Sequence, residues 1–288
     1  MAAYICSKPL QIMVALILAN PEKDELYLVD WFSDAERISV SKALGLRFSE
    51  VKIFQSRAQA MLAAAKKRHL EVFIDSDIGF KSFFCMALLK LLGCKLIAVY
   101  EEGIGTYRND ILFGWRKLIF KVLGGSCYFG QSFLIGRVMV FDSDRYRSLF
   151  PRSSKKVVKI PISLQLWCEK NVELLKEIFA SELDLDMSGK TPIRIYLTDW
   201  NIDKELLKSL SQKGEFYVKP HPHIREGAII EYRKTFPSVK WLPASVPAEL
   251  IFLLALSERD EVEVYHYGSS AVYYFSSVAL KSILLVRA

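Results

Sequence analysis

The chain has 288 residues, of which 51% are hydrophobic, so it can form one large domain or two ordinary ones and is too apolar for a disordered protein. The formal net charge of +7 favours anionic partners such as nucleotide phosphates, but the basic residues match no nucleic-acid-binding motif. The five cysteines lack Cys-x-x-Cys spacing, which argues against a metal site and is typical of reduced thiols in a cytoplasmic protein.

Strand-like and helix-like runs alternate through the first half of the chain. Strands are predicted at residues 3–6, 25–31, 51–55, 71–74 and 95–100, with helices at 10–18, 34–44, 57–68 and 81–92. Strands that alternate with short helices form βαβ units and a parallel sheet. Residues 142–162 lose this pattern and contain Pro151 and Pro161, so we expect a linker there.

The alternation resumes after an amphipathic run at 164–180 and a polar loop at 181–190. Strands are predicted at 193–197, 216–218, 239–242, 262–266 and 282–286, with helices at 203–210, 228–234 and 248–256 and a helix start at 270–276. The pattern predicts an α/β protein with two Rossmann-like domains, residues 1–160 and 161–288. Ligands of such folds bind outside the carboxyl ends of the strands, so we expect a cleft between those ends of the two sheets.

A His-Pro motif, Lys219-Pro220-His221-Pro222-His223, follows the strand predicted at 216–218. Proline fixes its own φ and restricts the residue before it, so His221 is expected in a well-defined turn. An imidazole that exchanges a proton near neutral pH, beside an ammonium group, suits a leaving phosphate. The alternative is a Pro-rich surface loop with incidental histidines.

Two carboxylate candidates also lie at strand ends. Glu101-Glu102-Gly103 follows the strand predicted at 95–100, and neighbouring carboxylates can raise one pKa and prepare a general base. Asp199 ends the strand predicted at 193–197. The alternatives are a solvated acidic turn for the first motif and a helix cap for Asp199.

Two further motifs are weaker alone. Gly268-Ser269-Ser270 opens a helix-like run, where backbone N–H groups and two hydroxyls can bind phosphate, although a serine there can simply be an N-cap. Glu249 lies in the first turn of the helix predicted at 248–256. It can accept hydrogen bonds from a ribose diol or just complement the helix dipole.

In chain order, Ser7-Lys8-Pro9-Leu10-Gln11, Glu101-Glu102-Gly103, Lys219-Pro220-His221-Pro222 and Ser269-Ser270 resemble motifs of the bacterial sialyltransferases of glycosyltransferase family 52. That family is related to the bacterial polysialyltransferases. An acidic-acidic-Gly motif, a His-Pro motif and a downstream serine pair characterise the group. The resemblance spans residues 3 to about 277, nearly the whole chain, and because each motif is short it depends on their order.

The resemblance implies a GT-B-type fold and an inverting, metal-independent transfer of sialic acid, with CMP-sialic acid as donor substrate and no cofactor. The acceptor would be a terminal sugar, galactose above all, of a lipooligosaccharide or capsular glycan. Residues 1–160 would form the acceptor side and 161–288 the CMP-binding domain. The roles it implies are a base at Glu102 or Asp199, phosphate stabilisation by His221, and donor binding by Lys219, Pro222, Glu249, Gly268, Ser269 and Ser270.

Several alternatives stay open. The same scaffold could transfer another sugar, such as a hexose or Kdo, or the chain could be a non-catalytic nucleotide-binding module. Residues 110–123 have the composition of an interfacial helix, which would give peripheral contact with the inner face of the cytoplasmic membrane, although a buried helix with snorkelling lysines also fits. No helix is predicted after the last strand, so domain closure could depend on another element or on a homodimer.

Overall fold

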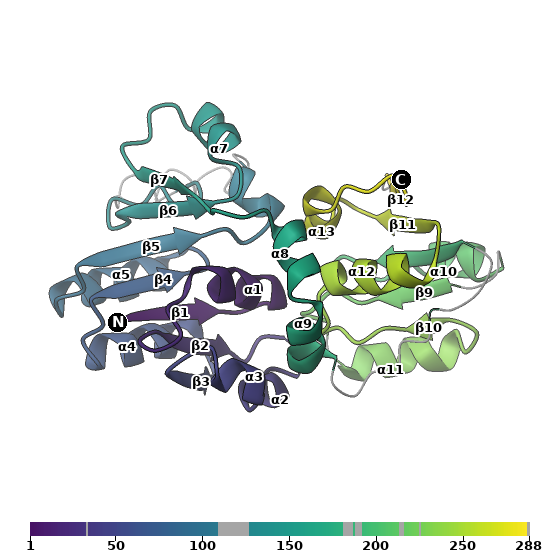
Figure 1. The fold of residues 1–288 in the computed structure, drawn as a ribbon, viewed down its shortest axis with the longest axis horizontal. Helices are drawn as coiled ribbons and strands as arrows, with labels where there is room; N and C mark the ends of the chain where they lie inside the picture. Colours follow the sequence, from purple (N-terminus) through teal and green to yellow (C-terminus); the bar gives the residue numbers. More distant parts are fainter. Residues whose placement is uncertain are drawn as a thin grey trace. The chain divides into compact units, whose positions relative to one another are not determined.

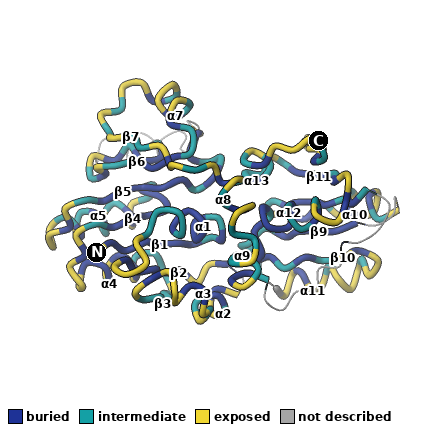
Figure 2. The backbone as a smooth tube through the Cα atoms, viewed as in Figure 1, coloured by how far each residue is buried: buried dark blue, intermediate teal, exposed yellow. Residues whose placement is uncertain are grey.

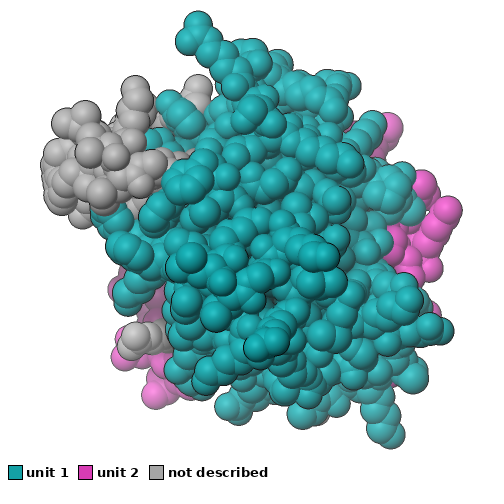
Figure 3. Space-filling view, turned by 90° about the vertical axis from the view of Figure 1, so that its left-hand side faces the viewer, with its two compact units in different colours: residues 1–31, 35–163 teal, residues 32–34, 164–288 magenta. Residues whose placement is uncertain are grey.

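The computed structural model describes residues 1–32, 34–108, 127–180, 187, 192–212, 216–224 and 226–286, which form two compact units. Unit 1 consists of Met1–Trp31 and Ala35–Ser163, and unit 2 of Phe32–Asp34 and Leu164–Ala288 (Figure 3). The division after Ser163 compares with a predicted domain boundary after residue 160. We describe each unit by itself.

Unit 1 contains, among the described residues, a seven-stranded parallel sheet (Figure 1). In two of its strands, β1 and β2, every residue is buried (Figure 2), as expected for parallel strands covered on both faces. Strand order runs outward from β1 in both directions, so it reverses between β1 and β4. Across the sheet the strands are β3 (Glu50–Phe54), β2 (Glu25–Val29), β1 (Ala2–Cys6), β4 (Glu71–Ile74), β5 (Leu96–Tyr100), β6 (Arg137–Val140) and β7 (Lys156–Lys159).

The helices of unit 1 connect these strands. They are α1 (Pro9–Leu18), α2 (Ala35–Ser39), α3 (Lys42–Gly45), α4 (Arg57–Lys66), α5 (Phe80–Leu91) and α7 (Ser143–Leu149), with a 3-10 turn, η1, at Ile104–Tyr107. Helix α4 begins after Ser56, whose hydroxyl accepts a hydrogen bond from Gln59 N at 3.3 Å. Its small residues Ala60 and Ala64 pack in the core on one face of the sheet, which positions the start of α4 at the carboxyl ends of the strands.

The linker predicted at residues 142–162 is wrong, because this segment holds α7 and β7. Asp142 caps α7 by accepting a hydrogen bond from Arg145 N at 2.9 Å. Strand β7 lies at the edge of the sheet, and its exposed ends Lys156 and Lys159 leave only two apolar residues in the run. Lysines on an edge strand hinder its pairing with a strand of another chain, and they also interrupt the apolar pattern by which strands are recognised in a sequence.

Unit 2 repeats the architecture on a smaller scale, with five parallel strands in its described part. Its strand order reverses between β8 and β11. Across the sheet the strands are β10 (Lys240–Trp241), β9 (Phe216–Lys219), β8 (Ile193–Leu197), β11 (Val262–His266) and β12 (Leu280–Leu284). The helices are α8 (Leu164–Lys170), α9 (Val172–Phe179), α10 (Lys204–Ser211), α11 (Glu226–Thr235), α12 (Ala248–Glu258) and α13 (Ser270–Tyr274). The two parallel sheets confirm the prediction of two Rossmann-like domains.

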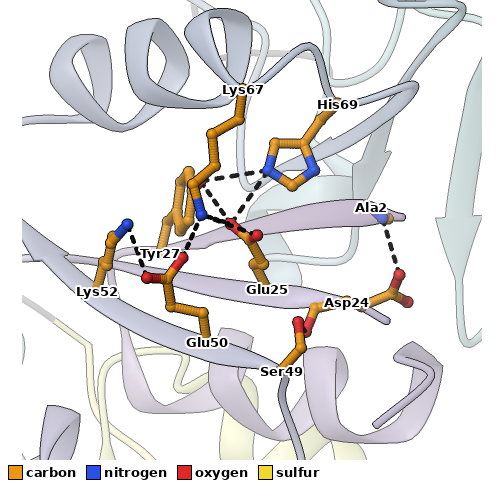
Figure 4. Close-up of polar contacts among 9 residues, drawn as sticks. All are labelled: Ala2, Asp24, Glu25, Tyr27, Ser49, Glu50, Lys52, Lys67 and His69. Atoms are coloured by element: carbon orange, nitrogen blue, oxygen red, sulfur yellow. Dashed lines mark hydrogen bonds and ion pairs between the residues drawn. The ribbon is translucent and has the colours of Figure 1, made fainter. Parts of the chain in front are cut away.

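The amino ends of β2 and β3 carry a polar cluster (Figure 4). Lys67 Nζ lies 2.9 Å from Glu25 Oε1 and also contacts the carboxylate of Glu50. Glu25 Oε2 accepts a hydrogen bond from the Tyr27 hydroxyl at 2.7 Å and lies 3.1 Å from His69 Nε2. The cluster therefore ties two neighbouring strands to the end of α4 at the edge opposite the carboxyl ends.

In the described parts of the chain, no helix combines the length and the apolar character that a membrane span requires. The interfacial helix predicted at 110–123 lies outside the described residues.

Candidate functional site

The strand-order reversal of unit 1 brings a hydroxyl and a carboxylate together. Ser7 follows β1 and Asp75 follows β4, and these two strands pair directly. Ser7 Oγ donates a hydrogen bond to Asp75 Oδ2 at 2.5 Å, and each residue is 1% exposed. In open α/β sheets this is the position where ligands bind. The fold therefore places a buried polar pair at the expected binding point.

Arg57 adds a cation to this pair. It is the first residue of α4, and its Nη2 lies 2.6 Å from Asp75 Oδ2. Gln11 of α1 fixes Ser7 by accepting a hydrogen bond from its backbone N–H at 2.6 Å. Asp75 Oδ1 and Arg57 Nε are buried and have no hydrogen-bond partner among the described residues. Leaving a buried polar atom without a hydrogen bond costs free energy, so these two atoms are well placed to form hydrogen bonds with a ligand.

The two neighbouring glutamates at the end of β5 have different surroundings. Glu101 is fully buried, and its Oε2 accepts hydrogen bonds from the Tyr107 hydroxyl at 2.7 Å and from Phe141 N at 2.6 Å. Burial raises the pKa of Glu102, with Lys8 opposing and Asp75 adding to the rise. The raised pKa makes Glu102 a stronger base than an ordinary glutamate.

The backbone beside Glu102 is adapted to hold its carboxylate. Gly103 has φ 116°, a conformation that favours glycine. A Cβ on Gly105 would come within 2.7 Å of Glu102 Oε1. The Glu102 N–H donates a hydrogen bond to Thr106 Oγ1 at 3.0 Å. Glycine at 105 therefore leaves room for the carboxylate beside the 3-10 turn η1, and the hydrogen bond to Thr106 fixes the Glu102 backbone.

Asp199 follows β8 at the strand-order reversal of unit 2. Its Oδ1 accepts a hydrogen bond from Asn201 N at 2.8 Å, which closes a local turn. The cap of α10 is Asp203, whose Oδ1 accepts from Leu206 N at 3.0 Å. The alternative in which Asp199 caps this helix is therefore wrong, and its role as a base stays a prediction.

The two histidines of the His-Pro motif stack on one indole. The ring centroids of His221 and His223 lie 4.8 and 5.1 Å from that of Trp200. His221 N donates to Thr198 Oγ1 at 2.9 Å, and His223 N donates to His221 Nδ1 at 3.3 Å. Pro222, between the histidines, is half-buried. The bond to Nδ1 assigns any proton transfer by His221 to Nε2.

Lys219 and Glu249 are both buried in unit 2 and influence each other electrostatically. They are 5% and 4% exposed, and no hydrogen bond or ion pair joins them within the described structure. Lys219 Nζ donates to the carbonyl oxygens of Pro220 at 2.8 Å and Ala244 at 2.9 Å. Burial lowers the pKa of Lys219 and raises that of Glu249, so both shift toward their neutral forms. In this state Lys219 joins two loops through these carbonyl oxygens, and the contacts of Lys219 and Glu249 with phosphate and ribose stay predictions.

The Gly268-Ser269-Ser270 turn is held by His266. Its Nδ1 accepts hydrogen bonds from the N–H groups of Gly268 at 3.0 Å and Ser269 at 3.1 Å. Burial lowers the pKa of His266, which favours the neutral form that can accept them. The Ser269 hydroxyl accepts from Ala271 N at 3.3 Å and so caps α13. A phosphate bound here would need other donors than these two N–H groups.

Comparison with solved structures shows the fold to be GT-B-like. The UDP-GlcNAc 2-epimerase of Methanocaldococcus jannaschii, in complex with UDP-GlcNAc and UDP, is 12% identical to this chain with a TM-score of 0.57. The match covers 98% of this chain and 88% of the epimerase chain. The UDP-GlcNAc 2-epimerase of Neisseria meningitidis, bound to UDP-GlcNAc, is 10% identical with a TM-score of 0.51, and the match covers 97% of this chain and 86% of that epimerase. No family model and no curated protein matches the sequence.

These comparisons contradict the resemblance to family 52 sialyltransferases. The similar structures belong to a different family, and no family model supports the sialyltransferase motifs. The physical reason is that each motif lies where a strand of a parallel sheet ends. Polar residues and glycines gather at such ends in any fold of this type, so their order along the chain reflects the GT-B-like fold.

Proposed function

We propose that the protein is an enzyme that acts on a nucleotide-activated sugar other than CMP-sialic acid, most simply a UDP-linked hexose or hexosamine. The observation that carries the proposal is the Ser7–Asp75–Arg57 group with its unpaired buried atoms, at the strand-order reversal of a GT-B-like fold. Both similar structures hold UDP-GlcNAc, which supports this substrate class.

We assign the nucleotide to unit 2 and the proton-transfer chemistry to unit 1. In glycosyl transfer, Glu102 would take the proton of the acceptor hydroxyl while that oxygen forms a bond to the anomeric carbon. The bond from this carbon to the phosphate oxygen breaks, and the nucleotide departs with the electron pair. Stabilisation of the nucleotide phosphate by His221 is a separate prediction for unit 2. The acceptor would be a glycan or glycolipid. Independence from metals stays a prediction, which activity in the presence of EDTA would test.

Epimerisation is the second candidate, because both named structural relatives are 2-epimerases. It also needs a group such as Glu102 that exchanges protons, but it requires no acceptor. The two reactions differ in their products. Transfer releases UDP only when an acceptor is present, whereas epimerisation converts the sugar of the intact nucleotide sugar.

The test is calorimetric titration with UDP, UDP-GlcNAc, UDP-hexoses and CMP-sialic acid, followed by NMR analysis of products with and without glycan acceptors. We expect binding of a UDP compound and turnover that Glu102→Gln lowers about 100-fold or more. Glu22→Gln, an exposed glutamate in unit 1, is the matched control and should keep full turnover. Absence of binding by every nucleotide and nucleotide sugar would overturn the proposal.

A further inference from the structure

Trp200 combines high exposure with a fixed position. It follows β8 beside the strand-order reversal of unit 2 and is 66% exposed. The rings of His221 and His223 are 5.2 Å apart, similar to the distance of each from the indole. Rings on opposite faces of the indole would be much farther apart. Both imidazoles therefore cover one face of Trp200.

The loops on both sides hold this stack before any ligand arrives. The Thr198 N–H donates a hydrogen bond to the carbonyl oxygen of Lys219 at 3.1 Å, and His221 N donates to the Thr198 hydroxyl at 2.9 Å. Pro220 and Pro222 restrict the backbone that carries the histidines. An exposed aromatic ring that is already fixed loses little conformational freedom on binding a ligand.

The surface aromatic Phe84 provides a contrast. It is also 66% exposed, but it lies within α5 of unit 1, and its ring meets that of Phe83 edge-on with centroids 5.9 Å apart. Single exposed aromatic residues of this kind are ordinary. Trp200 differs because it lies at the carboxyl ends of the strands, where ligands of open α/β sheets bind.

We propose that the indole face of Trp200 opposite the histidines is the stacking surface for the pyrimidine base of the nucleotide. The inference rests on the proposed function, because it specifies how unit 2 recognises its ligand. A flat heterocycle matches a flat indole in offset stacking, and the two imidazoles support the indole from behind. Stacking of this kind requires that the ligand has a base, but it discriminates little between one base and another.

The experiment measures binding of UMP, UDP, a UDP-sugar and ribose 5-phosphate to the full chain by calorimetry. Trp200→Ala should weaken UMP and UDP binding about 5- to 150-fold, and Trp200→Phe should restore most of it. Ribose 5-phosphate, which lacks a base, should bind the parent and both variants equally. Phe84→Ala is the matched control and should leave all affinities unchanged. Thermal melting checks that each variant is folded.

The outcomes separate this inference from the proposed function. If the parent binds UDP and Trp200→Ala binds it equally tightly, the stacking surface is refuted while the proposed function stands. If Trp200→Ala weakens the UDP-sugar but not UMP, the indole contacts the sugar, and the assignment to the base is wrong. If the parent binds no nucleotide, both fail together.

Discussion

The ion pair between Arg57 and Asp75 gives the sharpest test of the candidate site. Arg57→Met keeps most of the side-chain volume and removes the guanidinium that lies 2.6 Å from Asp75 Oδ2. The side chains are 17% and 1% exposed, so the substitution leaves an almost fully buried carboxylate with fewer partners. Removing one partner of a buried pair costs about 3–5 kcal/mol. Because Ser7 still donates to Asp75, we expect about 3 kcal/mol.

A double-mutant cycle separates the pair from other effects of each substitution. Asp75→Asn alone should also destabilise, because it leaves the cation without its partner. The double variant should cost less than the sum of the single variants, with a coupling energy of about 2 kcal/mol. Urea denaturation measures these values, with separate transitions allowed for the two units. Arg147→Met, which breaks the exposed pair with Asp144, is the control and should cost at most about 0.5 kcal/mol. A cost for Arg57→Met no larger than the control would refute the reasoning.

Three further predictions concern unit 1. Gly130→Ala should destabilise it by about 2–5 kcal/mol in urea denaturation, because φ is 74° and the new Cβ would meet Val138 Cγ2 at 2.7 Å. Glu102→Gln should raise the melting temperature at pH 8 but not at pH 4, because burial raises the Glu102 pKa and the stability of its protonated form is lost as pH rises through that value. Lys67→Met should cost about 1 kcal/mol at pH 7, measured by urea denaturation, because solvent screens this half-exposed ammonium. The loss should fade in acid, because the pKa of Glu25 is lowered against its burial by Tyr27 and Lys67, and that of Glu50 by Lys52 and Lys67. Equal effects at both pH values would contradict either of the last two.

Most strands of the two sheets were predictable from their alternation with helix-like runs. The strands predicted at residues 71–74, 193–197 and 262–266 coincide with β4, β8 and β11, in which β-branched and aromatic residues predominate although Arg194 and Glu263 lie within them. Prediction failed toward the far edge of the first sheet. There β6 was not predicted, and β7 was taken for a linker because its exposed lysines remove the apolar pattern.

The candidate site was predictable only as far as strand ends reveal it. Ser7 and Glu102 each follow an apolar run, and this signal is local. Asp75 gives the same signal after the strand at 71–74, but its importance depends on β4 pairing with β1. The order of strands in a sheet cannot be deduced from the hydrophobic periodicity of the sequence. Arg57 reaches the site only because α4 starts over the same edge. The sequence analysis therefore missed both partners of the ion pair.

Strand-end motifs specify a place more reliably than a chemistry. Lys219 and His266 show this clearly, since both end strands of the second sheet and both could bind phosphate. The structure instead directs Lys219 to two backbone carbonyls and uses His266 to hold the N–H groups of Gly268 and Ser269. Whether a polar side chain at a strand end turns toward its own loop or toward a ligand depends on the loops packed behind it. The substrate therefore has to be established by ligand binding, with variants in each unit tested separately.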